Sequence, residues 1–335
     1  MRAWRVTGVG PPSAVLDLVD VDPPDPPPGF LRLRVDAAAV GLPDVLMCAG
    51  TYPLTPATPF TPGQEVVGVV TAVGPDVDPG LVGARVMGVT AFYLGWGGLA
   101  EETLAAAVTV FPAPDLLDDA HAAGFHIPFQ TAWIGLRERA GLLDGETVVV
   151  LGASGGSGSA AVLLGRAIGA RVVAVAGGAD KVAFCRALGA DHVIDHRQDD
   201  VAEAVLELTD GRGADVVFAP VGAEAGERAG TVMASGGRFL LVGFAGGRWP
   251  VLDPGALVHG NSSVMGVYAG AHDRDQTLAT YADLFALLDS GALTPLPTAT
   301  FRFDDAGAAL ETLRRRDATG KLVVVPADPS GEVPR

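Results

Sequence analysis

Residues 146–176, which read ETVVVLGASGGSGSAAVLLGRAIGARVVAVA, constrain the fold of this chain more than any other stretch. The apolar, β-branched run 148–151 leads into a glycine-rich turn. Small residues typical of a tightly packed helix follow, and then comes a second apolar run, 172–175. A strand, a glycine turn, a helix and a strand in this order predict a βαβ unit of a parallel sheet.

The glycine turn also predicts a binding site for a dinucleotide. Glycines let the backbone approach a pyrophosphate closely, and a helix N-terminus offers free N–H groups and a partial positive charge. The first glycine of the GxGxxG pattern is replaced by Ala153, so the strand–turn–helix context carries the prediction. The residues expected at the phosphates are Ser154, Gly155, Gly156, Ser157 and Gly158. The alternative is a glycine-rich turn without a ligand.

The end of the second strand indicates which dinucleotide binds. Proteins that bind NAD usually place Asp or Glu there to bond the ribose 2′-hydroxyl. Here small residues, Gly177 among them, leave room for a 2′-phosphate, and Lys181 supplies a positive charge. We interpret Asp180 as a helix N-terminal residue favoured by the helix dipole. The sequence therefore predicts NADPH, and the alternative is that Lys181 is an ordinary surface lysine.

Composition narrows the classes of partner. The net charge of −16 argues against nucleic acids and anionic membranes, which attract basic patches. Two cysteines, Cys48 and Cys185, are too few for a disulfide framework or a four-cysteine zinc site. No secretory signal pattern and no apolar run of membrane length is present. We expect a cytoplasmic protein that acts on a small molecule and has neither a nucleic acid nor a membrane as partner.

The pattern of predicted strands and helices changes after residue 123 and again after residue 268, which predicts two domains. Residues 1–123 contain short apolar runs separated by Gly and Pro, typical of a partly closed antiparallel barrel. Residues 124–268 alternate strands and helices, as in a doubly wound α/β sheet. Its strands are expected near 147–151, 171–176, 192–195, 215–219, 238–243 and 263–267. Residues 269–335 resemble the beginning of the chain, so we expect them to return to the first domain.

Several motifs together carry a resemblance to a known family. They lie in residues 40–53, 62–70 (PGQEVVGVV), 98–101 (GLAE), 152–158 (GASGGSG), 188–195 (LGADHVID), 236–244 (GGRFLLVGF) and 318–321 (ATGK). With these motifs the chain resembles a zinc-free medium-chain dehydrogenase/reductase of the quinone oxidoreductase type over nearly its whole length. The resemblance implies a Rossmann domain, 124–268, inserted into a GroES-like catalytic domain formed by 1–123 and 269–335.

The resemblance also implies further cofactor-binding residues. These are Thr131, His196, Val221, Phe244, Ala245, Tyr268 and Lys321. His196 stands where the family often has a Tyr near the 2′-phosphate, and it can still donate a hydrogen bond. Gly41 stands where the family often has an Asn that helps to hold the nicotinamide. Two functional hypotheses remain open: an NADPH-dependent reductase, or an NADP(H)-binding protein with little catalysis that acts as a sensor or structural protein. The presence of Tyr52 favours the reductase, while the loss of the Asn slightly favours the binding protein.

The positions that bind zinc in zinc-dependent relatives argue against a metal in this chain. Leu42 and Gln64 occupy the places of the Cys and His ligands, and neither side chain is a zinc ligand. Hydride transfer to an acceptor that is already electrophilic, such as a quinone or a conjugated enone or enoyl compound, needs no Lewis acid.

Two residues of the first domain are candidates for the chemistry. Tyr52 matches a Tyr that is proposed as the proton donor in enoyl reductases of the family, and its alternative role is loop packing. Asp44 is a second catalytic candidate, although a structural role in orienting its loop is the stronger interpretation. His126, in the segment 124–131, is a weaker candidate for proton transfer.

The apolar run 263–267 would form an exposed sheet edge, which predicts a homodimer.

Overall fold

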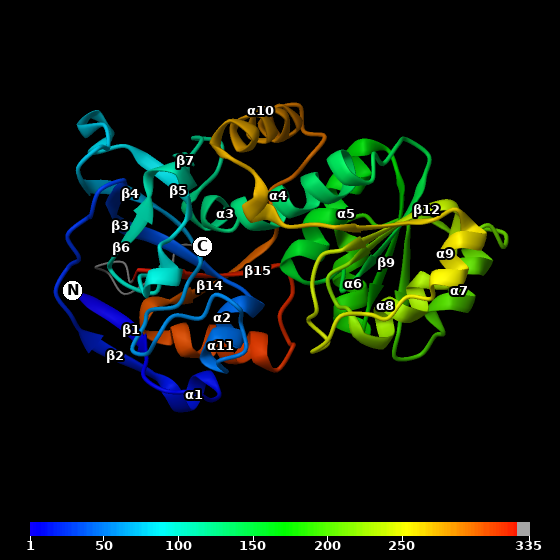
Figure 1. Cartoon of the computed structure of the whole chain (residues 1–335), viewed down its shortest axis with the longest axis horizontal. Coiled ribbons are helices and arrows are strands. Elements are labelled where there is room, and N and C mark those ends of the chain that lie inside the picture. The colour runs from blue at the N-terminus through cyan, green and yellow to red at the C-terminus, as the bar shows by residue number, and fades with distance from the viewer. Residues whose placement is uncertain (327–335) are drawn as a thin grey trace. The chain divides into compact units, whose positions relative to one another are not determined.

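The computed structural model describes residues 1–326 (Figure 1). Contacts divide the chain into two compact units, one formed by Met1–His126 with the segment from Pro297 onward, the other by Ile127–Leu296. The first boundary lies three residues from the expected one. The second lies at 296/297 and not at 268/269, because the segment after the last parallel strand packs within the second unit. The Gln130 side-chain amide donates hydrogen bonds there to Ala269 O (3.3 Å) and Thr277 Oγ1 (3.1 Å).

The first unit is built on a seven-stranded sheet with the order β14-β15-β3-β4-β5-β7, in which β6 also pairs with β3. Its strands are β3 (Phe30–Val40), β4 (Glu65–Val73), β5 (Arg85–Val89), β6 (Glu102–Ala106), β7 (Val110–Pro112), β14 (Thr298–Arg302) and β15 (Lys321–Val325). Only β14 and β15 pair in parallel, and the other pairs are antiparallel. A separate ribbon joins β1 (Arg2–Val6) and β2 (Leu16–Asp20).

The core of this unit is formed by side chains from one face of its strands and by buried residues of short helices. On β3, Leu31, Leu33 and Val35 are buried on one face of the strand, as expected for side chains two residues apart. The helices of the unit are α1 (Pro12–Val15), α2 (Leu42–Cys48), α3 (Asp119–Ala123) and α11 (Ala306–Arg314), and 3₁₀ turns cover Pro79–Leu81, Phe92–Leu94, Ala107–Thr109 and Phe303–Asp305. The core includes buried residues of α2 and α11, so the chain's late segment contributes to the first unit.

The second unit contains a fully parallel six-stranded sheet with the order β10-β9-β8-β11-β12-β13. Its strands are β8 (Thr147–Leu151), β9 (Arg171–Ala176), β10 (His192–Asp195), β11 (Ala214–Ala219), β12 (Met233–Leu241) and β13 (Ser263–Gly266). This is the doubly wound order, and the predicted parallel sheet is confirmed. The strand order reverses between β8 and β11, and ligands of such sheets bind beyond the carboxyl ends of the strands at that point.

Helices link these strands and lie along the sheet (Figure 1). They are α5 (Gly156–Ile168), α6 (Ala179–Ala187), α7 (Val201–Leu208), α8 (Ala223–Gly230) and α9 (Pro254–Gly260). Before β8, α4 (His126–Trp133) continues into a π-helical stretch, Ile134–Arg139. After β13, a 3₁₀ turn, Ala269–Ala271, leads to α10 (Arg274–Asp289). Among residues 1–326, no helix is both long and apolar enough to span a bilayer.

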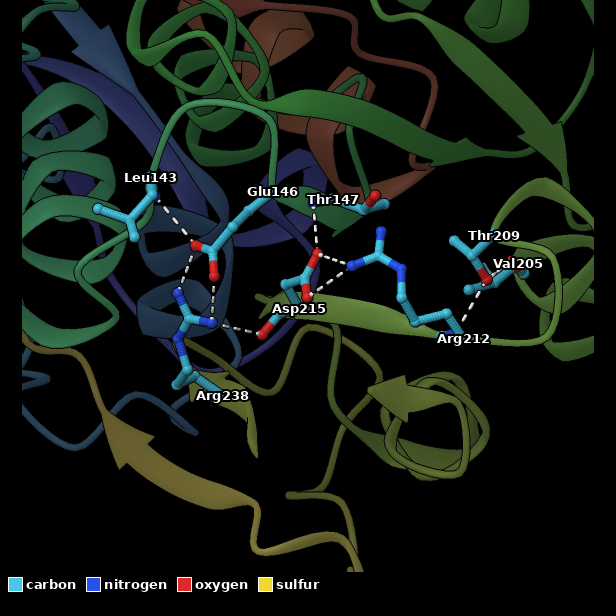
Figure 2. Close-up of polar contacts among 9 residues, drawn as sticks. Leu143, Glu146, Thr147, Val205, Thr209, Arg212, Asp215 and Arg238 are labelled. Atoms are coloured by element: carbon cyan, nitrogen blue, oxygen red, sulfur yellow. Dashed lines mark hydrogen bonds and ion pairs between the residues drawn. The ribbon is translucent and has the colours of Figure 1, made fainter. Parts of the chain in front are cut away.

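The amino ends of the parallel strands are held by a polar network (Figure 2). Arg238 forms a two-pronged ion pair with Glu146, with N–O distances of 2.8 and 2.6 Å, and its Nε donates to Ala140 O. The Asp215 carboxylate accepts the N–H of Thr147 at 2.7 Å. These contacts fix the amino ends of the strands, which lie at the opposite end of the sheet from the glycine turn. A substitution in this network is therefore distant from the predicted cofactor site.

Candidate functional site

The turn after β8 has the close packing that a pyrophosphate site requires. Gly152 has a φ of +59°, a conformation that favours glycine. A Cβ atom on Gly158 would collide with the carbonyl oxygen of Gly152 and lie 2.8 Å from Ala153 Cα. Ser159 Oγ donates to Ala153 O, which ties the turn to α5. Helix α5 therefore starts directly against the end of β8, and only glycine fits at residue 158.

The first turn of α5 presents unused backbone donors. The N-cap is Gly155, which has no side chain to cap the helix, and the first bond within the helix is Ser159 N to Gly155 O. The N–H groups of Gly156, Ser157 and Gly158 thus have no acceptor within the helix. Together with the positive end of the helix dipole, they are suited to an anion. The five residues predicted at the phosphates lie together in this turn.

A second cluster of donors lies at the carboxyl end of β9. A Cβ atom on Gly177 would be 2.5 Å from His196 Nε2 and 3.2 Å from Arg197 Nε, and one on Gly178 would be 2.9 Å from Arg197 Nη1. The imidazole and the guanidinium therefore lie directly over the two glycines. Asp195 holds this arrangement, because its Oδ1 accepts the N–H groups of both Gly178 and Arg197 at 3.0 Å. These bonds keep the pKa of Asp195 below its usual value.

Arg197 is a candidate binding residue that the sequence motifs do not single out. Lys181, the cation that the sequence does single out, lies in the first turn of α6 and is partly buried. Asp180, beside it in the same turn, is exposed. Arg197 is identified because the residues after β10 lie against Gly177 and Gly178, which follow β9. This proximity is seen only in the three-dimensional structure.

The remaining residues predicted in the second unit fall into two groups. Val221 lies beside the glycine turn, since a Cβ atom on Gly152 would be 3.0 Å from its Cγ2, and the N–H of Ala245 donates to Pro220 O. Phe244 packs against Trp249, with ring centroids 5.0 Å apart and ring planes tilted by 50°. Thr131 and Tyr268 form the second group, because the Gln130–Ala269 hydrogen bond ties their two segments together. Thr131 is buried and Tyr268 is 63% exposed.

In the first unit, Asp44 joins two loops. Its Oδ2 accepts the N–H of Gly41 and its Oδ1 accepts the N–H of Gly63, both at 2.8 Å, and the residue is only 1% exposed. Burial raises the pKa of Asp44 to about 6, although the two backbone bonds oppose this shift. Both carboxylate oxygens are thus occupied by the backbone, which supports the loop-orienting role. Its catalytic role stays a prediction.

Lys321 and Tyr52 have contacts of their own within the first unit. The Lys321 ammonium forms a buried ion pair with Glu65. A Cβ atom on Gly41 would lie 3.7 Å from Lys321 Nζ, so this lysine is next to the position where the family often has Asn. Tyr52 is partly buried against the core, with its ring 6.5 Å from that of Phe92. This is the packing role; proton donation by Tyr52 stays a prediction.

His126 is buried and stacks on Phe111, with ring centroids 5.8 Å apart. Burial lowers the pKa of His126 to about 4, so the imidazole is neutral at pH 7. A base with so low a pKa is poorly matched to proton transfer near neutral pH. The structure therefore favours packing as the role of His126.

The same shift predicts a pH dependence of stability. In the unfolded chain a histidine takes up a proton near pH 6.5, whereas folded His126 does so only near pH 4. The unfolded state therefore binds more protons between these values, and stability falls as the pH falls. From pH 7.5 to pH 4 the unfolding free energy of the wild type should decrease by about 3 kcal/mol more than that of His126→Phe. Urea unfolding at both pH values measures this, and equal decreases would contradict it.

The residues at the zinc positions of zinc-dependent relatives do not fit a zinc ion. Leu42 begins α2 and has no ligand atom, and Gln64 offers only an amide. Among residues 1–326, no group of three or more His, Cys, Asp or Glu side chains is placed to hold a metal ion. Cys48 and Cys185 are both buried free thiols.

Comparisons with known proteins agree with this architecture. The family model described as "Alcohol dehydrogenase GroES-like domain" matches residues 27–115, and the one described as "Zinc-binding dehydrogenase" matches 156–286. Quinone oxidoreductase of Sus scrofa is 32% identical over 329 residues, which cover 97% of this chain and 98% of the relative. A mycobacterial protein solved in complex with NADPH superposes with a TM-score of 0.88 at 30% identity, covering 97% of this chain and all of the other.

A further relative is a much longer protein. A phenolphthiocerol/phthiocerol polyketide synthase chain of Mycobacterium tuberculosis is 37% identical over 303 residues, which cover 88% of this chain and 13% of the synthase. The full-length match to the porcine enzyme, both family models and the parallel sheet lead to one conclusion. The chain belongs to the medium-chain dehydrogenase/reductase superfamily, in its quinone oxidoreductase type.

Proposed function

We propose that this chain is a zinc-independent oxidoreductase that transfers a hydride from NADPH to a quinone or to a conjugated enone or enoyl compound. The observation that carries the proposal is the pairing of an uncapped glycine turn with the His196 and Arg197 side chains at the end of β9, where the neighbouring Asp195 carboxylate accepts the backbone N–H groups of Gly178 and Arg197. The mycobacterial relative of similar fold binds NADPH, and the porcine relative is a quinone oxidoreductase, which supports it.

The chain's residues have distinct roles in this function. The first turn of α5 holds the pyrophosphate, and the cations beside Gly177 hold the 2′-phosphate. Thr131, Val221, Phe244, Ala245 and Tyr268 position the nicotinamide half. When bound, NADPH supplies the hydride.

The acceptor takes up two electrons and two hydrogens. With a conjugated enone the hydride adds to the β-carbon, the electron pair of the C=C bond moves toward the carbonyl oxygen, and a proton then completes the α-carbon. Tyr52 is the proposed proton donor. With a quinone, uptake of the two electrons and the hydrogen of the hydride leads to a hydroquinone anion, which water can protonate. Asp44 acts on neither step; it fixes the loops that carry the reacting groups.

The cofactor assignment is tested by removing the cations one at a time. Lys181→Ala and Arg197→Ala should each weaken NADPH binding about ten- to hundredfold, because one charge-assisted phosphate contact contributes about 1.5–3 kcal/mol. NADH lacks the phosphate, so its affinity should not change. Arg186→Ala, at the far end of α6, is the matched control. Fluorescence titration of both cofactors measures the effect. Equal wild-type affinities for NADPH and NADH would contradict the assignment.

A panel of acceptors separates the enzyme from the alternative function. Oxidation of NADPH is followed with quinones, enones and 2-enoyl thioesters. Turnover with one class identifies the substrate type. Tight NADPH binding without turnover on any of them would favour the binding protein with little catalysis, to which the missing Asn at Gly41 points.

We further propose that the protein is a cytoplasmic homodimer. Strand β13 forms one edge of the parallel sheet, and Val264 on it is 38% exposed. Exposed sheet edges are usually paired or covered, and pairing with a second copy of the chain across a two-fold axis would cover the edge at β13. Light scattering at micromolar concentration should give twice the chain mass of 34.1 kDa. A monomer at that concentration would refute the proposal.

A further inference from the structure

The segment between β13 and α10 carries an aromatic ring that the protein leaves exposed. Residues 267–273 join the last parallel strand to α10. Tyr268, the second residue of this segment, is 63% exposed, although its backbone directly follows the carboxyl end of β13. Its ring lies over Gly270, because a Cβ atom there would be 2.8 Å from both Cζ and Oη of Tyr268. A glycine at residue 270 therefore leaves room for the ring at the surface.

The ring lies on the side of the sheet toward which the second half of a dinucleotide would extend. Ligands of doubly wound sheets lie across the carboxyl ends of the strands. The glycine turn follows β8, and the side chains of His196 and Arg197 follow β10, on one side of that turn. On the other side β11, β12 and β13 succeed one another, and β13 is three strand spacings, about 14–15 Å, from β8. With the 2′-phosphate on the first side, the nicotinamide half extends toward Tyr268.

A buried glutamine of α4 holds this segment. Gln130 is 1% exposed, and its side-chain nitrogen donates to Ala269 O at 3.3 Å and to Thr277 Oγ1 at 3.1 Å. The Thr277 hydroxyl in turn donates to Asp273 O at 2.9 Å. One amide thus bonds the residue directly after Tyr268 and, through Thr277, the residue at which the segment ends.

The position of the Gln130 nitrogen requires a hydrogen-bond donor. Both atoms that face it are acceptors, because one is the carbonyl oxygen of Ala269 and the hydroxyl hydrogen of Thr277 is already donated. The amide oxygen has no hydrogen-bond partner among residues 1–326, so the nitrogen makes the bonds that hold the segment. A methionine would have a similar length and donate nothing, and a glutamate would place a carboxylate against two oxygen atoms.

Other contacts fix the two ends of the segment. The N–H of Val267 donates to Leu241 O on β12 at 2.9 Å, and the His272 ring is hydrogen-bonded to the Glu138 carboxylate at 2.9 Å. Glu138 belongs to the π-helical stretch that continues α4, and such stretches are frequent at functional sites. Between these ends, the Gln130 amide bonds the backbone next to the exposed ring.

We propose that Gln130 is a positioning residue for the cofactor: its amide holds the backbone at Ala269 so that the Tyr268 ring packs against the nicotinamide half of bound NADPH. This inference rests on the proposed function, because that function supplies NADPH. A ring on a loose segment would have to be ordered when the cofactor binds, which lowers the affinity, whereas a segment fixed beforehand avoids this cost. The effect concerns the nicotinamide half and leaves the contacts of the adenosine half unchanged.

The test is a double-mutant cycle measured by calorimetry with two ligands. They are NADPH and adenosine 2′,5′-bisphosphate, which has the adenosine and the 2′-phosphate but no nicotinamide. Tyr268→Ala should weaken NADPH binding about tenfold and Gln130→Met about three- to tenfold, and neither should change the affinity for the bisphosphate. Because Gln130 acts through Tyr268, the double variant should bind NADPH no more weakly than Tyr268→Ala alone.

The control is Thr280→Val, one turn beyond Thr277 on α10, which removes a buried hydroxyl that has no partner among residues 1–326. It should bind both ligands as the wild type does. If Gln130→Met does not fold, Thr277→Val removes one of the two bonds and should give a smaller loss with NADPH alone. Losses that add in the double variant, or that are equal for the two ligands, would indicate a general structural role and overturn the proposal.

Failure of this inference is distinguishable from failure of the proposed function. If the wild type binds NADPH tightly and Gln130→Met binds it equally well, Gln130 has no positioning role, and the reductase function is unaffected. A wild type that does not bind NADPH would overturn the proposed function and this role with it.

Discussion

Gly158→Ala is expected to disrupt the second unit, whereas Gly155→Ala in the same turn leaves it folded. A methyl group on residue 158 collides with the carbonyl oxygen of Gly152 and with Ala153 Cα, both of them backbone atoms that cannot rotate away. Relieving the clash requires α5 to move off β8, at a cost at or above the upper end of about 1–3 kcal/mol. A methyl group on residue 155 meets only Gly152 O, at an ordinary 3.6 Å.

The two variants therefore separate folding from binding. Gly158→Ala should unfold at lower urea concentration and lose NADPH binding. Gly155→Ala should keep the wild-type midpoint but bind NADPH more weakly, because the added methyl lies where the pyrophosphate approaches the backbone. Urea unfolding and fluorescence titration measure both effects. A wild-type midpoint in Gly158→Ala would show that the turn is looser than its contacts indicate.

The parallel sheet could be predicted because its signals are local. Each strand is a short apolar run, and the turn after β8 is marked by three glycines within four residues of Gly155. The strands observed at 147–151 and 171–176 match the predicted ranges, and the order β10-β9-β8-β11-β12-β13 follows from the doubly wound rule.

The boundary of the two units and part of the site could not be predicted, because their signals lie in contacts distant in sequence. Helix α10 belongs to the second unit through the Gln130 hydrogen bonds, which join residues more than 130 positions apart. Arg197 emerges as a candidate only once β9 and β10 bring it over the glycine pair.

Asp44 and Tyr52, the two catalytic candidates, are interpreted differently because their contacts differ. Asp44 has both oxygens committed to backbone N–H groups, so a structural role explains its contacts completely. Tyr52 has a ring packed near Phe92 and a partly exposed residue surface, which is compatible with packing and with proton donation. Only kinetics can separate the two roles of Tyr52.

Tyr52→Phe is expected to bind NADPH normally and to reduce conjugated enones slowly. Phenylalanine keeps the ring against Phe92 and differs from tyrosine by the hydroxyl, so the ring contact is retained. Loss of a general acid typically lowers the rate about 10²–10⁴-fold. Reduction of a quinone should fall far less, because its product is a stable hydroquinone anion that water protonates. The ratio of the loss in enone reduction to the loss in quinone reduction therefore reports proton donation, because a general defect in folding or stability would lower both rates equally.

The measurement is the rate of NADPH oxidation by wild type and Tyr52→Phe with one enone and one quinone, at saturating cofactor. Tyr93→Phe is the matched control, since Tyr93 packs edge-on against the same Phe92 and is 41% exposed. If the control loses as much enone activity as Tyr52→Phe, the loss reflects the aromatic cluster. If Tyr52→Phe reduces the enone at the wild-type rate, Tyr52 only packs, and the proton comes from solvent or another donor.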